Sequence, residues 1–265
     1  MPLDSEIRDH VIEYCDAHVL RGDGVSALFD FIDSKDMRER LVQEYEAARY
    51  VYKLGEALAA SDRRLYAHVK FQIVQYAAIY EAIIVYLLWT KFSAHPAVAD
   101  IEFHSVYKKA GDLPQDIQIS KKSGEEIHLC VDSKQRTSRA SIKFDDKVGA
   151  AIKIGFINPA LAEEIKVIYK QRNAIHIESA LKNQIDFELN QSMLAYRRMV
   201  PFIAGIKSFL KNGSLPYQKD GSVKAKHDLG DISFEDGADG VDDYYLKAAA
   251  EAADAIPSDS TGGMI

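Results

Sequence analysis

The stretch INPALAEEIKVIYKQRNAIHIES, residues 157–179, decides how this sequence folds. Asn158 followed by Pro159 is a strong helix start, because asparagine caps the amino terminus of a helix and proline fits its first turn. Each residue of a helix rotates the chain by about 100°, so the apolar residues that follow recur on one side. The spacing predicts a single inward stripe that consists of Leu161, Ile165, Ile168, Arg172, Ile175 and His176. Two of these side chains, Arg172 and His176, are polar.

A second apolar stretch, FQIVQYAAIYEAIIVYLLW at residues 71–89, is almost long enough to cross a bilayer. It is interrupted by Gln72, Gln75 and Glu81, and one charge at the bilayer centre costs about 2.5–3.5 kcal/mol. The flanks also lack the positive charges that accompany a membrane span. We therefore expect a buried core helix from about residue 62 to 92, and no membrane partner.

Helical spacing continues on both sides of this core helix and predicts a mainly α protein. Helices are expected over residues 5–19, 25–32 and 35–60, which form an N-terminal helical segment, residues 1–60. The main helical bundle is expected over residues 61–212. Its last helix, residues 187–211, is expected to kink at Pro201 and to end before Gly213.

The period changes from about 3.6 to 2 between residues 112 and 143. DIQIS, EEIHLCV and RASIKF alternate apolar and polar residues, and KKSG supplies a turn. We expect a small β-hairpin or three-stranded flap inserted into the bundle. The basic residues of this region either hold RNA or protect a solvated strand edge from aggregation. They are Lys121, Lys122, Lys134, Arg136 and Arg139.

Residues 213–265 are rich in Gly, Asp, Ser and Lys and poor in large apolar residues. Such a composition buries too little surface to offset chain entropy, so we expect a disordered acidic tail. Within it, VDDYYLKAAAEAADAI at residues 241–256 is either a short helix that docks on a protein partner or a transient solvated helix.

The composition excludes several classes of protein. A formal net charge of −7 argues against a generally cationic nucleic-acid coat, so any contact with RNA or DNA must be local. Cys15 and Cys130 lie outside any zinc or disulfide spacing, and no phosphate-binding glycine loop is present. We therefore expect neither a metal ion nor a cofactor. The start, MPLDSEIRDHVIEY, lacks the pattern of a signal peptide, which favours the cytoplasm.

Arg172, Asn173 and His176 form the strongest candidate site in the sequence. A guanidinium group binds phosphate with two parallel hydrogen bonds, and an imidazole titrates near neutral pH. Together they can cleave RNA without a metal, because the histidine moves a proton while the arginine stabilises charge on phosphorus. One copy offers a single histidine, so a symmetric dimer would supply the second. Alternatively, Arg172 is a structural ion-pair partner of Glu81 and His176 is a core histidine.

The run INPALAEEIKVIYKQRNAIHI, together with the earlier helix YAAIYEAIIVYLL, resembles the HEPN superfamily over roughly residues 62 to 210. The resemblance implies a helical bundle and a homodimeric, metal-independent endoribonuclease that acts on single-stranded RNA, as a toxin or an anti-phage defence effector. Arg172 would match the motif arginine, Asn173 the polar residue after it, and His176 the motif histidine. The family's usual motif has a longer gap than the three residues between Arg172 and His176. This short gap favours the alternative, a non-catalytic scaffold that binds a protein or nucleic acid.

Overall fold

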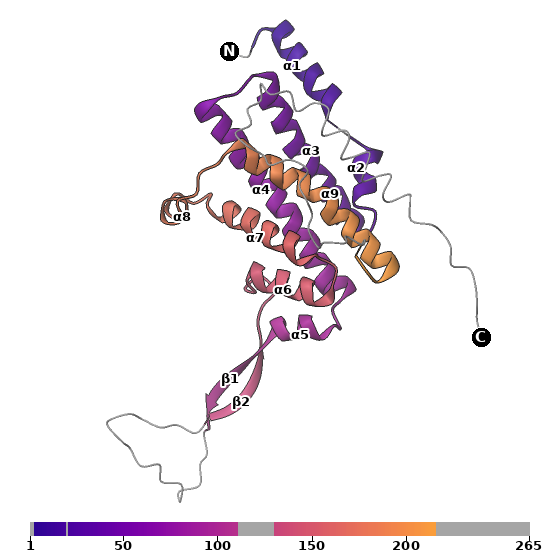
Figure 1. Cartoon of the computed structure of the whole chain (residues 1–265), viewed down its shortest axis with the longest axis vertical. Coiled ribbons are helices and arrows are strands. Elements are labelled where there is room, and N and C mark those ends of the chain that lie inside the picture. The colour runs from indigo at the N-terminus through magenta and orange to yellow at the C-terminus, as the bar shows by residue number, and fades with distance from the viewer. Residues whose placement is uncertain (1–2, 20, 111–129, 216–265) are drawn as a thin grey trace, which may run out of the picture.

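The computed structural model describes residues 3–19, 21–110 and 130–215 of the 265-residue chain. The described part of the chain is mainly helical and contains one small antiparallel sheet, as predicted (Figure 1). In chain order the elements are α1 (Ser5–His18), α2 (Asp23–Leu28), α3 (Lys35–Ala57), α4 (Asp62–Tyr86), the π-helix η1 (Leu87–Lys91), α5 (Pro96–Glu102), β1 (Phe103–Lys109), β2 (Cys130–Arg136), α6 (Phe144–Ile154), α7 (Pro159–Asn173), α8 (Ile177–Asn183) and α9 (Leu189–Asn212).

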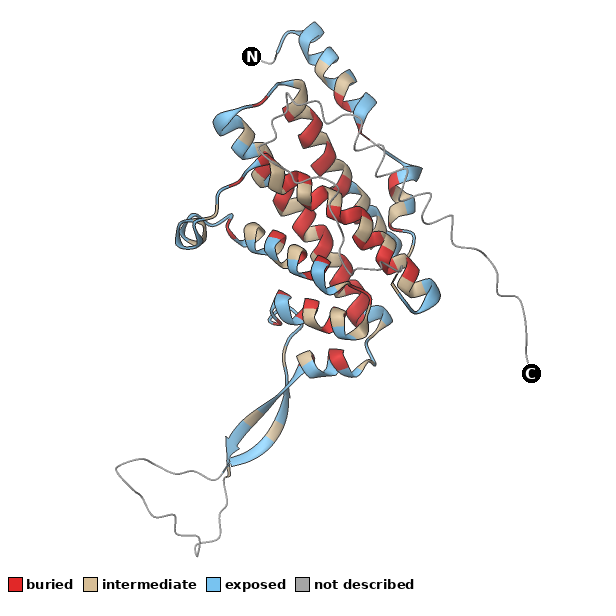
Figure 2. Cartoon of the chain, viewed as in Figure 1, coloured by how far each residue is buried: buried red, intermediate tan, exposed pale blue. Residues whose placement is uncertain are grey.

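Helix α4 is the central helix of the bundle. It packs against α3, α7, α9 and α6, and its middle is buried from several sides (Figure 2). Tyr76, Tyr80, Ile83 and Ile84 are fully buried. By length and composition alone, Asp62–Lys91 could cross a membrane, but 61% of its apolar window is buried within the described structure. The predicted core helix over residues 62–92 is therefore confirmed.

The N-terminal helices join the central helix through α3, and buried residues of α2 and α3 belong to the same core as those of α4. One cluster of buried residues runs from Val25 and Phe29 to Ile206 in α9. Helix α3 lies along α4, and α1 lies along α3 with Cys15 as its buried residue. All three predicted N-terminal helices are present, with α2 shorter than expected.

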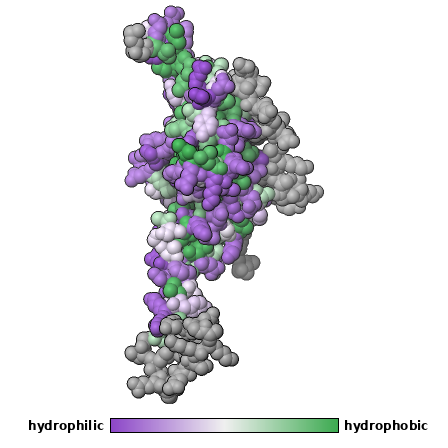
Figure 3. Space-filling model, turned by 90° about the vertical axis from the view of Figure 1, so that its left-hand side faces the viewer, coloured by the Kyte–Doolittle hydropathy of each residue, from purple (hydrophilic) through white to green (hydrophobic). Residues whose placement is uncertain are grey.

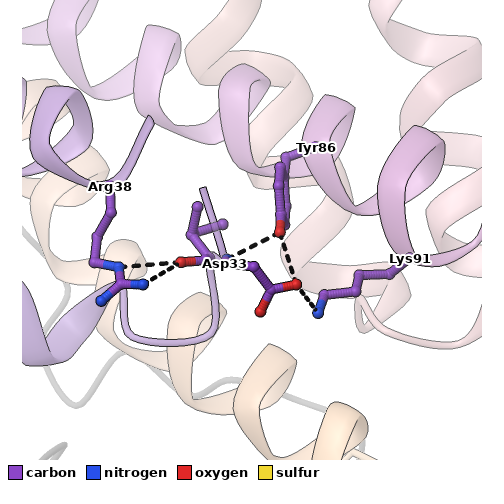
Figure 4. A network of polar contacts seen from close by, with 5 residues as sticks. Asp33, Arg38, Tyr86 and Lys91 are labelled. Carbon is purple, nitrogen blue, oxygen red and sulfur yellow. Dashed lines mark hydrogen bonds and ion pairs between the residues drawn. The ribbon is translucent and has the colours of Figure 1, made fainter. Parts of the chain in front are cut away.

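The loop between α2 and α3 is tied to the far end of α4 by a network of polar contacts (Figure 4). The Arg38 guanidinium donates two hydrogen bonds to the Ile32 carbonyl, at 3.0 and 2.8 Å. The Tyr86 hydroxyl accepts from the Asp33 amide at 2.9 Å and donates to its carboxylate at 3.2 Å. Lys91 pairs with the same carboxylate, and its hydrogen bond lowers the pKa of Asp33.

The predicted bounds of the β insertion, residues 112–143, are wrong. Among the described residues the strands are β1 and β2, which pair antiparallel from Phe103 opposite Arg136 to Lys109 opposite Cys130. RASIKF, residues 139–144, forms a turn and the start of α6, and its alternation arises because Ile142 and Phe144 are buried there. DIQIS and the first residues of EEIHLCV lie outside the described residues.

Helix α9 confirms the predicted last helix of the bundle. It continues on both sides of Pro201, and Gly213 ends it with a φ angle of 72°. Such an angle suits glycine, as the sequence indicated. Most of the predicted tail, including the docking helix at residues 241–256, lies outside the described residues.

Candidate functional site at the end of helix α7

Helix α7 starts where the sequence predicts. The Asn158 side chain accepts a hydrogen bond from the Ala160 amide at 2.8 Å, and Pro159 occupies the first turn. Leu161, Ile165 and Ile168 are buried and face the core. This apolar face holds α7 against α4 and fixes the position of the residues that follow.

The predicted continuation of the inward stripe through Ile175 and His176 is wrong. Helix α7 ends at Asn173, and the chain then turns so that Ala174 is completely buried. Ala174 joins a second apolar cluster that contains Val69 and Phe187. Since Ala174 takes the inward position, its two successors are exposed, and His176 becomes the residue that precedes α8.

Arg172 is held by three neighbours at the last turn of α7. One terminal nitrogen donates to the Tyr169 hydroxyl at 3.4 Å and to the Asn173 side-chain oxygen at 3.2 Å. The other lies 3.9 Å from a carboxylate oxygen of Glu81. The guanidinium carbon also lies 5.3 Å from the centre of the Tyr169 ring. The Arg172 side chain nevertheless keeps 35% of its surface exposed, so it remains accessible.

The Glu81 carboxylate connects α4 with both α6 and α7. It accepts a hydrogen bond from the Tyr169 hydroxyl at 3.3 Å and lies 3.7 Å from the buried ammonium group of Lys147. Burial raises the pKa of the Tyr169 hydroxyl, and the negative charge of Glu81 raises it further. The Tyr169 ring stacks on Phe144, with ring centres 3.9 Å apart. Aromatic packing and charge therefore fix this end of α7.

An open pocket of about 620 Å³ lies between the start of α6 and the outer side of α7. Its size is typical of small-ligand sites. Lys147 pairs with Glu81 and Lys166 with Glu163, whereas Lys143 and Lys170 form no ion pair with any residue in the described ranges. The pocket borders the candidate motif and is lined by Glu81, Ala140, Ser141, Ile142, Lys143, Phe144, Asp145, Lys147, Glu163, Lys166, Val167, Tyr169, Lys170 and Asn173.

Helix α8, on the other side of His176, has an exposed apolar surface. Ile177 and Leu181 keep 76% and 75% of their surface exposed, and Ile175 keeps 36%. No residue of α8 is buried. Helix α8 projects from the side of the molecule that Figure 3 shows, where hydrophobic surface lies among hydrophilic residues. We call Ile175, Ile177 and Leu181 the α8 patch.

The structure brings some of the predicted site residues together and separates others. Arg172 contacts Asn173 and Glu81, whereas the His176 side chain forms no hydrogen bond or ion pair with the part of the chain described here. Tyr169 and Lys147 were not among the site residues predicted from the sequence. Tyr169 lies three residues before Arg172, which places both on one helix face and could have identified it. Lys147 gives no comparable signal.

The described residues contain no group of three or more His, Cys, Asp or Glu side chains placed to hold a metal ion. No family model, curated protein or solved structure matches this chain.

Proposed function

We propose that this protein is a HEPN-type, metal-independent endoribonuclease that acts as a homodimer, as a toxin or an anti-phage defence effector in the cytoplasm. One observation carries the proposal: His176 is exposed at the break between α7 and α8, within four residues of the hydrogen-bonded pair Arg172 and Asn173. A histidine that only filled the core would be buried and hydrogen-bonded.

The proposed reaction is transesterification within the RNA strand. The 2′-hydroxyl attacks the neighbouring phosphorus, its proton passes to a base, and the 5′-oxygen leaves with a proton from an acid, which produces a 2′,3′-cyclic phosphate. His176 performs one of the two proton transfers, a contribution of about 10²–10⁴-fold. Arg172 stabilises the charge on the phosphoryl oxygens. Asn173 positions Arg172 through their 3.2 Å hydrogen bond.

A second copy of the chain supplies the second histidine. In a twofold dimer the same surface of each copy meets itself. The α8 patch is exposed and adjoins His176, so its burial between two copies would bring two His176 side chains to one site. Lys143 and Lys170, in the pocket beside Asn173, would then bind phosphates that flank the cleaved bond.

The second candidate function is a non-catalytic HEPN-type scaffold that binds a protein or nucleic acid. The contacts of Arg172 with Glu81 and Tyr169 favour it, because they are the contacts expected of a structural arginine. The ribonuclease requires the His176 side chain for cleavage of RNA, whereas the scaffold does not require it.

The deciding experiment is cleavage of labelled single-stranded RNA by the purified protein in EDTA. We expect products with cyclic phosphate ends and a loss of at least about 10²-fold in His176→Ala. His10→Ala is the matched control, because His10 is also exposed and lies on α1. No cleavage by the unmodified protein, or equal cleavage by both variants, would reject the ribonuclease and favour the scaffold.

A further inference from the structure

The two-stranded sheet extends away from the helices as a ribbon (Figure 1). Of the residues in β1 and β2, only Val106 and Ser133 are partly covered, and all others are exposed. An isolated two-stranded hairpin is marginally stable in water. Both faces of the ribbon are exposed, so contacts with the described helices contribute little to its stability. Its presence on the surface therefore indicates another role.

The base of the ribbon is firmly attached to the bundle. The buried carboxylate of Glu102, at the end of α5, accepts two hydrogen bonds from Arg136, at 3.0 and 2.6 Å. Arg139 lies 3.7 Å from the same carboxylate, and the Thr137 amide donates to the Glu102 carbonyl at 2.8 Å. The ribbon is therefore held at a defined place relative to the helices.

One face of the ribbon combines an exposed aromatic ring with positive charge. Tyr107 keeps 72% of its surface exposed. It lies opposite Asp132, and Ser105, two residues earlier, lies opposite Lys134. Side chains alternate between faces and directly paired residues share one, so this face holds Tyr107, Asp132, Lys109 and Lys134. The two lysines lie on either side of Tyr107, about 7 Å away along the strands.

The ribbon is basic although the whole chain is acidic. The two strands contain four basic residues and one acidic residue, Asp132, in a chain of formal net charge −7. Lys108, Lys109 and Lys134 form no ion pair with any residue that the structure describes, while Arg136 is occupied by Glu102. Three cations are thus available to an anionic partner.

We propose that this ribbon is a binding arm for single-stranded nucleic acid, with a base stacked on Tyr107 and the flanking phosphates bound by Lys109 and Lys134. An aromatic ring between cations is the arrangement that binds single strands, because every base has a stacking face and every nucleotide a charge. That the natural strand is RNA rests on the proposed function. The arm itself does not depend on catalysis by His176.

The test measures binding of a short labelled oligonucleotide by fluorescence anisotropy, with 2′-O-methyl riboses so that cleavage is impossible. Tyr107→Ala should weaken binding about 5- to 150-fold. Lys109→Ala and Lys134→Ala should each weaken it and lower the slope of affinity against salt by about one. Lys108→Ala is the matched control, since it removes the same charge from the opposite face and should have little effect.

Equal losses of affinity in Lys108→Ala and Lys109→Ala would overturn the proposal, because they would indicate a general electrostatic attraction of the strand and no specific binding face. No effect of Tyr107→Ala, or a preference for duplexes, would overturn it as well. Tighter binding of the 2′-O-methyl RNA than of a DNA strand of the same sequence supports RNA as the natural strand, and equal binding of the two supports an arm that binds single strands of either kind. The oligonucleotide cannot be cleaved, so this binding assay reports on the arm alone, and the cleavage assay of His176→Ala reports on the nuclease; failure of one is distinguishable from failure of the other.

Discussion

Arg172 and Glu81 face each other between α7 and α4, with a guanidinium nitrogen 3.9 Å from a carboxylate oxygen. The same carboxylate lies 3.7 Å from the Lys147 ammonium group, so one acidic side chain balances two cations from different helices. Arg172 consequently has a fixed position while a third of its side chain stays exposed. A phosphate can approach it without dismantling the bundle.

Replacing Glu81 with glutamine should destabilise the fold. Lys147 is buried and would lose its carboxylate, and a buried charge without a partner is costly. We expect a loss of about 1–3 kcal/mol in the free energy of unfolding, measured with urea. Glu163→Gln is the control, because the Glu163 side chain is 70% exposed and its pair with Lys166 contributes at most about 1 kcal/mol. Equal losses would contradict the central role of Glu81.

Gly155 should tolerate alanine less well than Gly213. Both have positive φ angles, of 101° and 72°, where a side chain is strained by about 1–2 kcal/mol. At Gly155 a new Cβ would also lie 3.3 Å from Phe209, whereas nothing lies within 4 Å at Gly213. Gly155→Ala should therefore lower the midpoint of thermal unfolding more. A larger effect of Gly213→Ala would show that Phe209 moves aside freely.

The attachment of the ribbon should weaken in acid. The hydrogen bond from Arg136 lowers the pKa of Glu102, as do the charges of Arg136 and Arg139. The stabilisation is therefore complete above the ordinary glutamate pKa of about 4.3 and is lost as the pH falls through the lowered value.

This acid transition can be followed at Trp89, the only tryptophan in the chain, because Arg139 lies 5.5 Å from the centre of its ring. We expect its fluorescence to change below about pH 4.3 while helical circular dichroism stays constant. Glu102→Gln should lack this change. A transition that persists in Glu102→Gln would assign it to another group.

The α8 patch should control self-association. Ile177→Asp and Leu181→Asp replace exposed side chains, so they should leave the stability of the monomer within about 0.5 kcal/mol. In sedimentation experiments both should reduce dimer formation, and RNA cleavage should fall with it. Ile7→Asp, at an exposed apolar position on α1, should change neither. A protein that stays monomeric at the concentration where it cleaves RNA would contradict the shared site.

Local signals were sufficient for several parts of the fold. Asn158 and Pro159 start α7 because their effect depends only on neighbouring backbone groups. Gly213 ends α9 for the same reason. The apolar run at residues 71–89 became the central helix, since Glu81 and two glutamines marked it as a protein core and the packing of α4 agrees.

Other parts depend on contacts that are distant in sequence. QRNAIHIES contains no glycine or proline, so nothing local predicts the end of α7 at Asn173. The break follows from the burial of Ala174 against Val69 and Phe187, which come from other segments. Similarly, RASIKF alternates as a strand would, but Ile142 and Phe144 are buried in a turn and at a helix start. Six alternating residues cannot distinguish these cases.

The exposure of α8 has a consequence for the thermodynamics of assembly. Helix α8 has seven residues and none is buried, although Ala180 packs partly against the second apolar cluster. It therefore gains little from packing, and a helix this short is marginal in water. If a second copy covers it, ordering of α8 and association become one event. The heat capacity would then fall on dimerisation by more than expected for the association of two surfaces that are already folded. Amide protons of α8 would also exchange more slowly as the protein concentration rises.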